Sequence, residues 1–104
     1  MHPKPGEVWL ADLGIAGKTR PVVIVSRFDP DAPRVLCIYV PLTSQDRESD
    51  YETPVQAKFL HSKSVANVQG IGSIPIPRLE RRIGVVSPET LAAIRESLRF
   101  ALEL

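Results

Sequence analysis

Near its start the chain reads PGEVWLADL at residues 5–13 and KTRPVVIVS at residues 18–26. The first stretch alternates imperfectly between apolar and polar residues, which is typical of a strand with one covered face. The second contains a continuous β-branched run, which predicts a strand buried on both faces. Residues 14–19 carry two glycines and are expected to form a loop. This arrangement places Arg20 at the beginning of the second strand.

The rest of the chain continues this pattern of short strands and turns. It holds ten prolines in 104 residues, about twice the usual share of about 5%. Prolines interrupt helices and central strands, so the composition favours many turns. We expect strands at 34–43, 53–57, 64–68 and 82–86, a turn at 29–33, a bent strand or loop at 70–77, and one helical turn at 77–80.

The one clear helix comes last. Ser87 is a candidate N-cap, Pro88 suits the first helical position, and Glu89 complements the helix dipole. Apolar residues then recur at helical spacing, which predicts an amphipathic helix of about four turns that packs on the sheet or on a partner. These residues are Leu91, Ile94, Leu98 and Leu102, with Ala92 and Ala101 beside them.

Length and composition predict one domain over residues 1–104, because the chain is long enough to bury a single core and shows no internal repeat. Apolar residues make up 43% of the chain, which suits a globular protein. The predicted fold class is mainly β: a small SH3-like antiparallel barrel with a C-terminal α-helix.

Charge and cysteine content narrow the possible functions. The formal net charge is +1, so the chain lacks the basic surface of a protein that binds duplex nucleic acid by bulk electrostatics. Any RNA site must therefore be local. The lone Cys37 lies in an apolar run and is expected to be a buried thiol. The sequence has no signal peptide and no apolar stretch of membrane-spanning length, so we expect a cytoplasmic protein without membrane contact.

Several kinds of site are disfavoured by spacing. The two histidines, His2 and His61, have no partner at metal-ligand spacing, so neither a metal nor a cofactor is expected. Residues 14–19 end in Gly-Lys-Thr but miss the phosphate-loop spacing by one residue, and a strand follows instead of a helix. Cys37 has no basic neighbour in sequence to activate it.

Two groups of residues remain as candidates for chemistry. One is the cluster Lys18-Thr19-Arg20, and the other is the strand end at Thr43-Ser44. By themselves these residues leave a simpler interpretation open, in which Arg20 is a surface arginine and Thr43 an ordinary strand-terminal hydroxyl.

Four pieces of the chain, in order, carry a resemblance to a known family. They are Gly6-Glu7-Val8-Trp9; Arg20-Pro21 before the β-branched run, with Thr43-Ser44 ending the next strand; Leu79-Glu80-Arg81-Arg82-Ile83-Gly84; and Ser87-Pro88-Glu89. In these features the sequence resembles the MazF/PemK family of toxin ribonucleases, whose barrel is also that of CcdB. The resemblance covers almost the whole chain.

The resemblance implies the toxin of a type II toxin–antitoxin system, a metal-independent and sequence-selective endoribonuclease acting on single-stranded RNA. In that chemistry the 2′-hydroxyl attacks its own 3′-phosphate and leaves a 2′,3′-cyclic phosphate and a 5′-hydroxyl. Arg20 and Thr43 stand where the family carries its key arginine and threonine. A small acidic antitoxin and a homodimer are also implied. The RNA-binding residues expected on this basis are Lys18, Thr19, Ser44, Gln45 and Gln69.

The chain departs from the family pattern in three places. The loop at 14–19 is short, Gln69-Gly70-Ile71-Gly72 lacks the acid and the arginine of the family's later strand, and residues 46–52 are acidic. An alternative is therefore a non-catalytic toxin of the same fold, CcdB-like and directed at DNA gyrase, or a barrel that binds a protein partner. A generic SH3-like peptide-binding module is less favoured, because the aromatic residues are few and spread through the chain.

Overall fold

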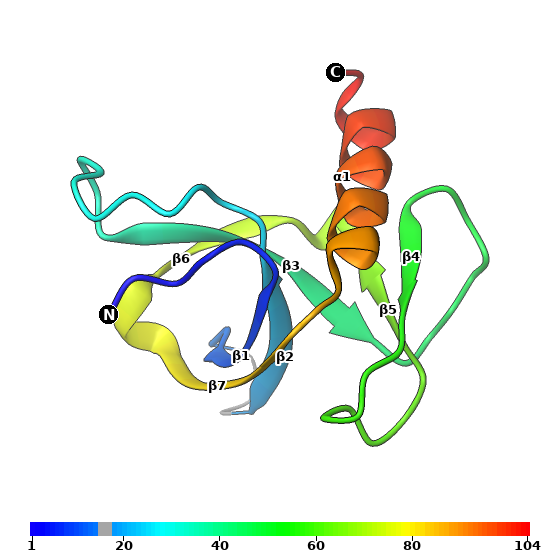
Figure 1. The fold of residues 1–104 in the computed structure, drawn as a ribbon, viewed down its shortest axis with the longest axis horizontal. Coiled ribbons are helices and arrows are strands. Elements are labelled where there is room, and N and C mark those ends of the chain that lie inside the picture. The colour runs from blue at the N-terminus through cyan, green and yellow to red at the C-terminus, as the bar shows by residue number, and fades with distance from the viewer. Residues whose placement is uncertain (15–17) are drawn as a thin grey trace.

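A computed structural model describes residues 1–14 and 18–104. The middle of the predicted loop 14–19, residues 15–17, lies outside the described part. Short strands dominate and one long helix ends the chain (Figure 1). The elements are β1 (Glu7–Asp12), β2 (Thr19–Ile24), β3 (Leu36–Thr43), β4 (Glu52–Val55), β5 (Ser64–Asn67), β6 (Gly72–Pro75), β7 (Leu79–Val85) and α1 (Pro88–Leu102), with 3₁₀ turns η1 (Val68–Gly70) and η2 (Ile76–Arg78).

The strands form one antiparallel sheet in the order β4-β5-β3-β2-β1-β7, and β6 pairs with the first half of β3. Within the described residues β4 and β7 do not pair, so the strongly bent sheet is barrel-like but open. This confirms the predicted fold class. The predicted edge strand with Pro54 is β4, which lies at the end of the sheet, where a residue without an N–H is tolerated.

The β-branched run of β2 is buried on both faces, as predicted. Val22, Val23 and Ile24 are fully buried. Val23 belongs to the core cluster beneath α1, whereas Val22 and Ile24 belong to a second cluster on the other face with Trp9. Successive residues of a strand point to opposite faces, so one uninterrupted run supplies both cores.

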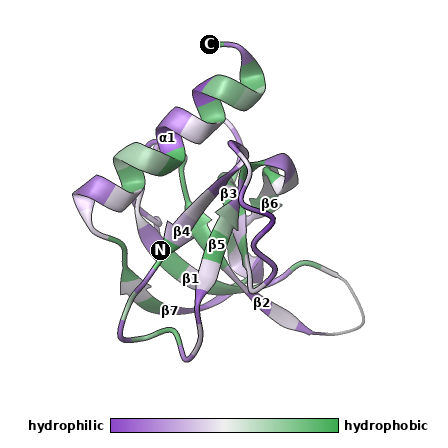
Figure 2. Cartoon of the chain, turned by 90° about the vertical axis from the view of Figure 1, so that its right-hand side faces the viewer, coloured by the Kyte–Doolittle hydropathy of each residue, from purple (hydrophilic) through white to green (hydrophobic). Residues whose placement is uncertain are grey.

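The helix α1 begins as its sequence predicts. The Ser87 hydroxyl oxygen accepts a hydrogen bond from the N–H of Thr90 at 3.1 Å. Fully buried Ile94 and its neighbours Leu91 and Leu98 pack against the core cluster, and in Figure 2 hydrophilic and hydrophobic residues alternate along the helix ribbon. On β4, the Thr53 hydroxyl bonds to the backbone oxygen of Ala93 at 3.3 Å.

The last turn of α1 differs from the prediction. Leu102 is 50% exposed, and Ala92 is exposed as well. The C-terminal end of the helix projects beyond the sheet (Figure 1), so Leu102 has nothing to pack against. Ala92 lies in the second turn, off the face that Leu91, Ile94 and Leu98 turn toward the core. Helical spacing identifies a shared face but not the length of surface available to cover it.

The segment 70–77 is a short strand between two 3₁₀ turns. Gly72 pairs with Tyr39 of β3, and a Cβ atom on Gly72 would lie 2.9 Å from the Tyr39 hydroxyl oxygen. The Tyr39 side chain therefore occupies the space of the missing side chain. The predicted helical turn at 77–80 is instead at Ile76–Arg78, because Leu79 already pairs with Ala11 as part of β7.

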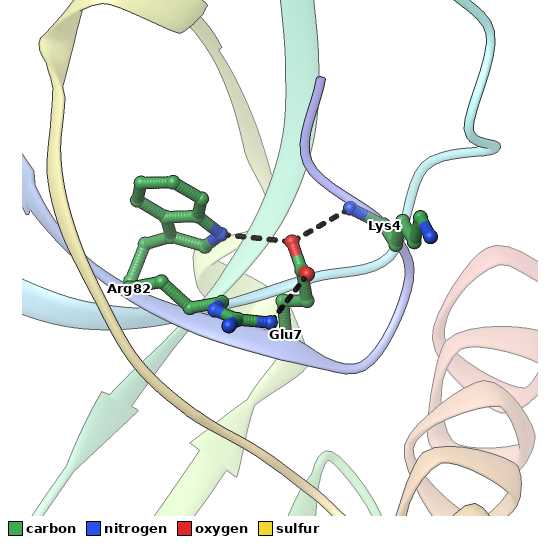
Figure 3. Close-up of polar contacts among 4 residues, drawn as sticks. Lys4, Glu7 and Arg82 are labelled. Carbon is green, nitrogen blue, oxygen red and sulfur yellow. Dashed lines mark hydrogen bonds and ion pairs between the residues drawn. The ribbon is translucent and has the colours of Figure 1, made fainter. Parts of the chain in front are cut away.

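The opening motif forms a structural junction (Figure 3). Glu7 is almost buried, and its Oε1 accepts hydrogen bonds from the Lys4 backbone N–H at 2.9 Å and from the Trp9 indole N–H at 3.1 Å. Its Oε2 accepts from the Arg82 guanidinium at 3.2 Å. Gly6 has a φ of 90°, which favours glycine. These motif residues therefore hold the first and last strands together.

No helix among residues 1–14 and 18–104 has the length and apolar character needed to cross a bilayer.

Candidate active site

Four strand ends meet along one edge of the sheet, the edge that runs across the ends of the strands and not along an outer strand. In the β1–β2 pair, Asp12 lies opposite Thr19, and in the β1–β7 pair, Ala11 lies opposite Leu79. The end of β3, at Thr43, lies beyond the last β2–β3 pair on the same side. This edge therefore gathers the predicted residues of the first loop and of β3, although they are far apart in sequence.

Arg20 and Thr43 lie at neighbouring ends of β2 and β3. The β2–β3 ladder ends at the pair Val22–Pro41, and Thr43, two residues further along β3, pairs with Val65 of β5. Side chains alternate along a strand, so Arg20 shares the face of Val22, and Thr43 shares the face of Pro41. Since Val22 and Pro41 are directly opposed, the sheet presents a guanidinium and a hydroxyl on one face at neighbouring strand ends.

The cations at this edge are solvent-accessible. Lys18, Thr19 and Arg20 are all exposed. Within the described part of the chain the only ion pairs are Arg82–Glu7 and Arg99–Glu96, so neither Lys18 nor Arg20 is neutralised there. Sequence reasoning missed a third cation, Arg78, whose guanidinium lies 3.1 Å from where a Cβ of Gly14 would stand. Lys18, Arg20 and Arg78 lie there beside one carboxylate, Asp12, so the edge carries an excess of positive charge in a nearly neutral protein.

The Thr43 hydroxyl has a defined orientation. Its oxygen accepts a hydrogen bond from the Gln45 backbone N–H at 3.2 Å. A hydroxyl has one donor hydrogen and two acceptor positions, so this bond fixes the oxygen and leaves the hydrogen able to donate. The half-buried Thr43 can therefore give one hydrogen bond to an anion at the sheet edge.

A polar cavity of about 200 Å³ opens beside Thr43. It contains three of the predicted site residues, Thr43, Gln45 and Gln69. Sequence reasoning missed the other four lining residues, which are Arg47, Ser49, Glu52 and Asn67. The signal that could have found two of them is the pairing of β4 with β5, which sets Glu52 opposite Asn67.

Gln69 reaches the cavity because η1 packs closely on β3. A Cβ atom on Gly70 would lie 2.6 Å from Cγ of Pro41, which is too close for any residue with a side chain. The Asn67 side-chain oxygen caps the turn by accepting from the Gln69 N–H at 3.1 Å. The glycine at position 70, a departure from the family pattern, is therefore needed for this approach.

The acidic segment beside Thr43 folds around its own carboxylates. Asp46 Oδ1 accepts from the Glu48 N–H at 2.8 Å, and Glu52 accepts from the backbone N–H groups of Arg47 and Ser49 at 3.2 and 3.1 Å. The Ser49 hydroxyl, which also donates to Glu52, is the main cause that lowers the pKa of that carboxyl. Two of the acids thus organise the loop.

Ser44 is not brought to the Thr43 cavity. It lines a separate hollow of about 290 Å³ with Asp46, Lys63 and Ser64. Consecutive residues of an extended chain point to opposite sides, so Thr43 and Ser44 diverge where β3 ends. The prediction that Ser44 shares the site of Thr43 gains no support from the structure.

The other reactive side chains lie elsewhere. His61 is exposed in the loop between β4 and β5 and lines none of the cavities described above. Cys37 is 2% exposed, and its burial raises the pKa of the thiol to about 11. Among the described residues, no three His, Cys, Asp or Glu side chains gather as metal ligands.

Cys37 is expected to resist alkylation in the native protein at pH 8. A thiol with a pKa near 11 is about 0.1% thiolate at that pH, and the thiolate is the reactive form. Labelling by iodoacetamide, followed by mass spectrometry, should be slow in buffer, should accelerate as the pH rises toward 11, and should be fast in denaturant. Rapid native labelling at pH 8 would contradict the burial of this thiol.

The residues of this site lie within a match to a known protein family. A family model described as "PemK-like, MazF-like toxin of type II toxin-antitoxin system" matches residues 4–102. The chain belongs to this PemK/MazF toxin family. The resemblance in the sequence is thereby confirmed, and the matched residues include Arg20, Thr43 and the cavity beside Thr43.

Solved structures of MazF-like toxins share the fold. A mycobacterial endoribonuclease, solved in complex with its cognate antitoxin, is 26% identical, with a TM-score of 0.86 over 98% of this chain and 96% of that one. The toxin MazF-mt6 of Mycobacterium tuberculosis is 28% identical, with a TM-score of 0.83 over 94% and 97%. MazF of Deinococcus radiodurans, at 23% identity, has a TM-score of 0.81 over 100% and 99%, and shows the fold alone.

Proposed function

We propose that this PemK/MazF-family toxin is an endoribonuclease that cleaves single-stranded RNA without a metal ion. The observation that carries the proposal is that exposed Arg20 and the Thr43 hydroxyl, whose hydrogen is free to donate, lie at the neighbouring ends of β2 and β3, just beyond the pair Val22–Pro41. The mycobacterial relatives named as endoribonucleases support the same activity. The locally basic edge suits a phosphate of a flexible strand better than a duplex.

The proposed reaction uses the RNA's own nucleophile. The 2′-hydroxyl loses its proton and its oxygen attacks the adjacent phosphorus. The bond to the 5′-oxygen breaks and that oxygen takes up a proton, so the products are a 2′,3′-cyclic phosphate and a 5′-hydroxyl. Negative charge builds on the phosphoryl oxygens, and the guanidinium of Arg20 meets two of them with paired hydrogen bonds. Thr43 donates one further bond that holds the phosphate in line. Arg20 is always protonated, so it stabilises charge and does not serve as the base.

We propose the same partners as the sequence predicts. The solved mycobacterial toxin was bound to its cognate antitoxin, and a small acidic antitoxin would complement the basic edge formed by Lys18, Arg20 and Arg78. A homodimer would cover exposed apolar side chains such as Leu36 and Ile38, which are 42% and 44% exposed on β3. A cytoplasmic location would give the toxin access to mRNA.

The test is cleavage of a long single-stranded RNA by the purified protein in the presence of a chelator, beside an all-deoxy strand of the same sequence. We expect discrete fragments with 5′-hydroxyl ends from the RNA and none from the deoxy strand, because only RNA carries the attacking 2′-hydroxyl. End-labelling with polynucleotide kinase, with and without phosphatase, identifies the ends. Intact RNA after incubation with folded protein would instead favour the gyrase-directed or partner-binding alternative.

A further inference from the structure

The last turn of α1 contacts the segment that leads into the polar cavity of the candidate active site. The Phe100 ring meets the Tyr51 ring edge-on, with 5.1 Å between the ring centroids and 68° between the ring planes. One turn earlier in the helix, Ser97 Oγ lies 3.0 Å from the Thr53 hydroxyl oxygen. Between Tyr51 and Thr53 stands Glu52, which lines the cavity. Because side chains alternate along an extended chain, the start of β4 faces α1 on one side and the cavity on the other.

A chain of hydrogen bonds runs from Glu52 to the Thr43 hydroxyl. Oε2 of Glu52 accepts from the Arg47 N–H at 3.2 Å. The Arg47 guanidinium donates to the Gln45 side-chain oxygen at 3.4 Å, and the Gln45 N–H donates to the Thr43 hydroxyl oxygen at 3.2 Å. The group that fixes the Thr43 oxygen therefore belongs to the same loop, residues 44–51, that ends at Tyr51.

The backbone of Tyr51 is bonded to two walls of the cavity. Its carbonyl oxygen accepts from the Val68 N–H at 3.0 Å, where η1 begins, and Gln69 of η1 lines the cavity. Its N–H donates to the Ser49 hydroxyl at 3.3 Å, and that hydroxyl donates to Oε1 of Glu52 at 2.8 Å. A displacement of Tyr51 would therefore disturb both the loop and η1.

The loop 44–51 depends on its aromatic end. The bonds that link Glu52, Arg47, Gln45 and Thr43 are exposed to water, so each contributes little net stability. Tyr51 instead packs against the main core cluster, and an edge-to-face aromatic pair stabilises beyond the area that it buries. The contact between the two rings is therefore the firm attachment of this loop to the rest of the molecule.

We propose that Phe100 is a positioning residue for RNA cleavage: through Tyr51 it holds the loop 44–51 in the arrangement that orients the Thr43 hydroxyl. The inference rests on the proposed function, in which Thr43 acts on the phosphate. Phe100 itself is not among the residues that line the cavity. The last turn of α1 thus influences the site at the end of β3, in addition to the packing of the helix on the core.

The test compares Phe100→Ala in two backgrounds by single-turnover cleavage with enzyme in excess. With Thr43 present, we expect cleavage to slow about three- to tenfold, the range that corresponds to the loss of one aromatic pair. In the Thr43→Ala background the same change should have no further effect, because the hydroxyl that it positions is gone. Phe100→Tyr keeps the ring and should cleave like wild type.

Leu102→Ala is the matched control at the same end of the helix. Leu102 is 50% exposed and Phe100 is 51% exposed, so both changes remove a similarly accessible apolar side chain, and Leu102→Ala should cleave normally. The hydrogen-exchange rate of the Gln45 amide, measured by NMR, gives a readout that needs no cleavage. It should rise in Phe100→Ala by the same factor as cleavage falls, and stay unchanged in Leu102→Ala.

Three results would overturn the positioning role: wild-type cleavage by Phe100→Ala, an equal loss of rate with and without Thr43, or an unchanged exchange rate at Gln45. Faster exchange at Gln45 in a protein whose wild type does not cleave RNA would overturn the nuclease proposal. The link from Phe100 to the loop 44–51 would then still stand.

Discussion

Arg20→Ala is expected to slow RNA cleavage by about 10²–10³-fold. The reason is that Arg20 lies at the strand end next to that of Thr43 and has no ion-pair partner among the described residues, so its charge is available to the phosphoryl oxygens. Because the side chain is exposed, its removal should leave the thermal midpoint almost unchanged. Single-turnover cleavage of one radiolabelled RNA, with circular dichroism melting alongside, measures both.

Two matched variants distinguish the effect of the guanidinium group from the effect of a positive charge alone. Arg20→Lys keeps the positive charge but loses the paired donors, so its rate of RNA cleavage should lie between the rates of wild type and Arg20→Ala. Arg95→Ala removes an exposed arginine from α1, on another part of the molecule, and should cleave normally. Cleavage by Arg20→Ala at the wild-type rate would remove Arg20 from the proposed mechanism.

Glu7→Ala is expected to lower the free energy of unfolding by about 3 kcal/mol, because it strips the buried Trp9 indole N–H and the Lys4 backbone N–H of their acceptor. For a chain of this size the loss corresponds to a fall in Tm of roughly 15 °C. The effect arises from the two unpaired donors and not from the ion pair with Arg82 (Figure 3). Urea unfolding followed by tryptophan fluorescence measures it.

Arg82→Ala is the matched control for Glu7→Ala. The Arg82 side chain is 55% exposed, and Glu7 keeps its bonds to Trp9 and Lys4 without it, so Arg82→Ala should cost only about 1 kcal/mol. Glu7→Gln keeps one oxygen that can accept from Trp9 and Lys4. Its free energy of unfolding should therefore fall by an amount between those of the two alanine variants. If Arg82→Ala destabilised the protein as much as Glu7→Ala does, the ion pair, and not the bonds to Trp9 and Lys4, would stabilise this junction.

Features set by neighbours in the chain were predictable from the sequence. The turn at 29–33 is an example, because Asp29 accepts a hydrogen bond from the Asp31 N–H at 3.0 Å, as prolines and aspartates in series indicate. The start of α1 at Ser87 is another. The buried run of β2 was predictable too, since β-branched residues without polar interruption leave no face for water.

The candidate site was only partly predictable. Thr43, Gln45 and Gln69 were expected and share one cavity. Glu52 was missed because an acid in an acidic segment is typical of a solvated loop, and nothing in its neighbours shows that three donors hold its carboxylate. That arrangement exists only once the loop folds back and β4 pairs with β5.

The sequence by itself determined the mainly β class and the C-terminal helix, because period-two and helical patterns and local turn residues act over a few positions. The family followed from the resemblance of short motifs in the same order along the chain. Tertiary structure alone decided that Glu7 bonds to Arg82, 75 residues away, and that Gly70 packs on Pro41 beneath the cavity. It also decided that Glu52 lies with Asn67 beside Thr43. These contacts depend on which strands pair and in what register. Strand pairing brings together residues that are far apart in the sequence, and no local pattern predicts their distance.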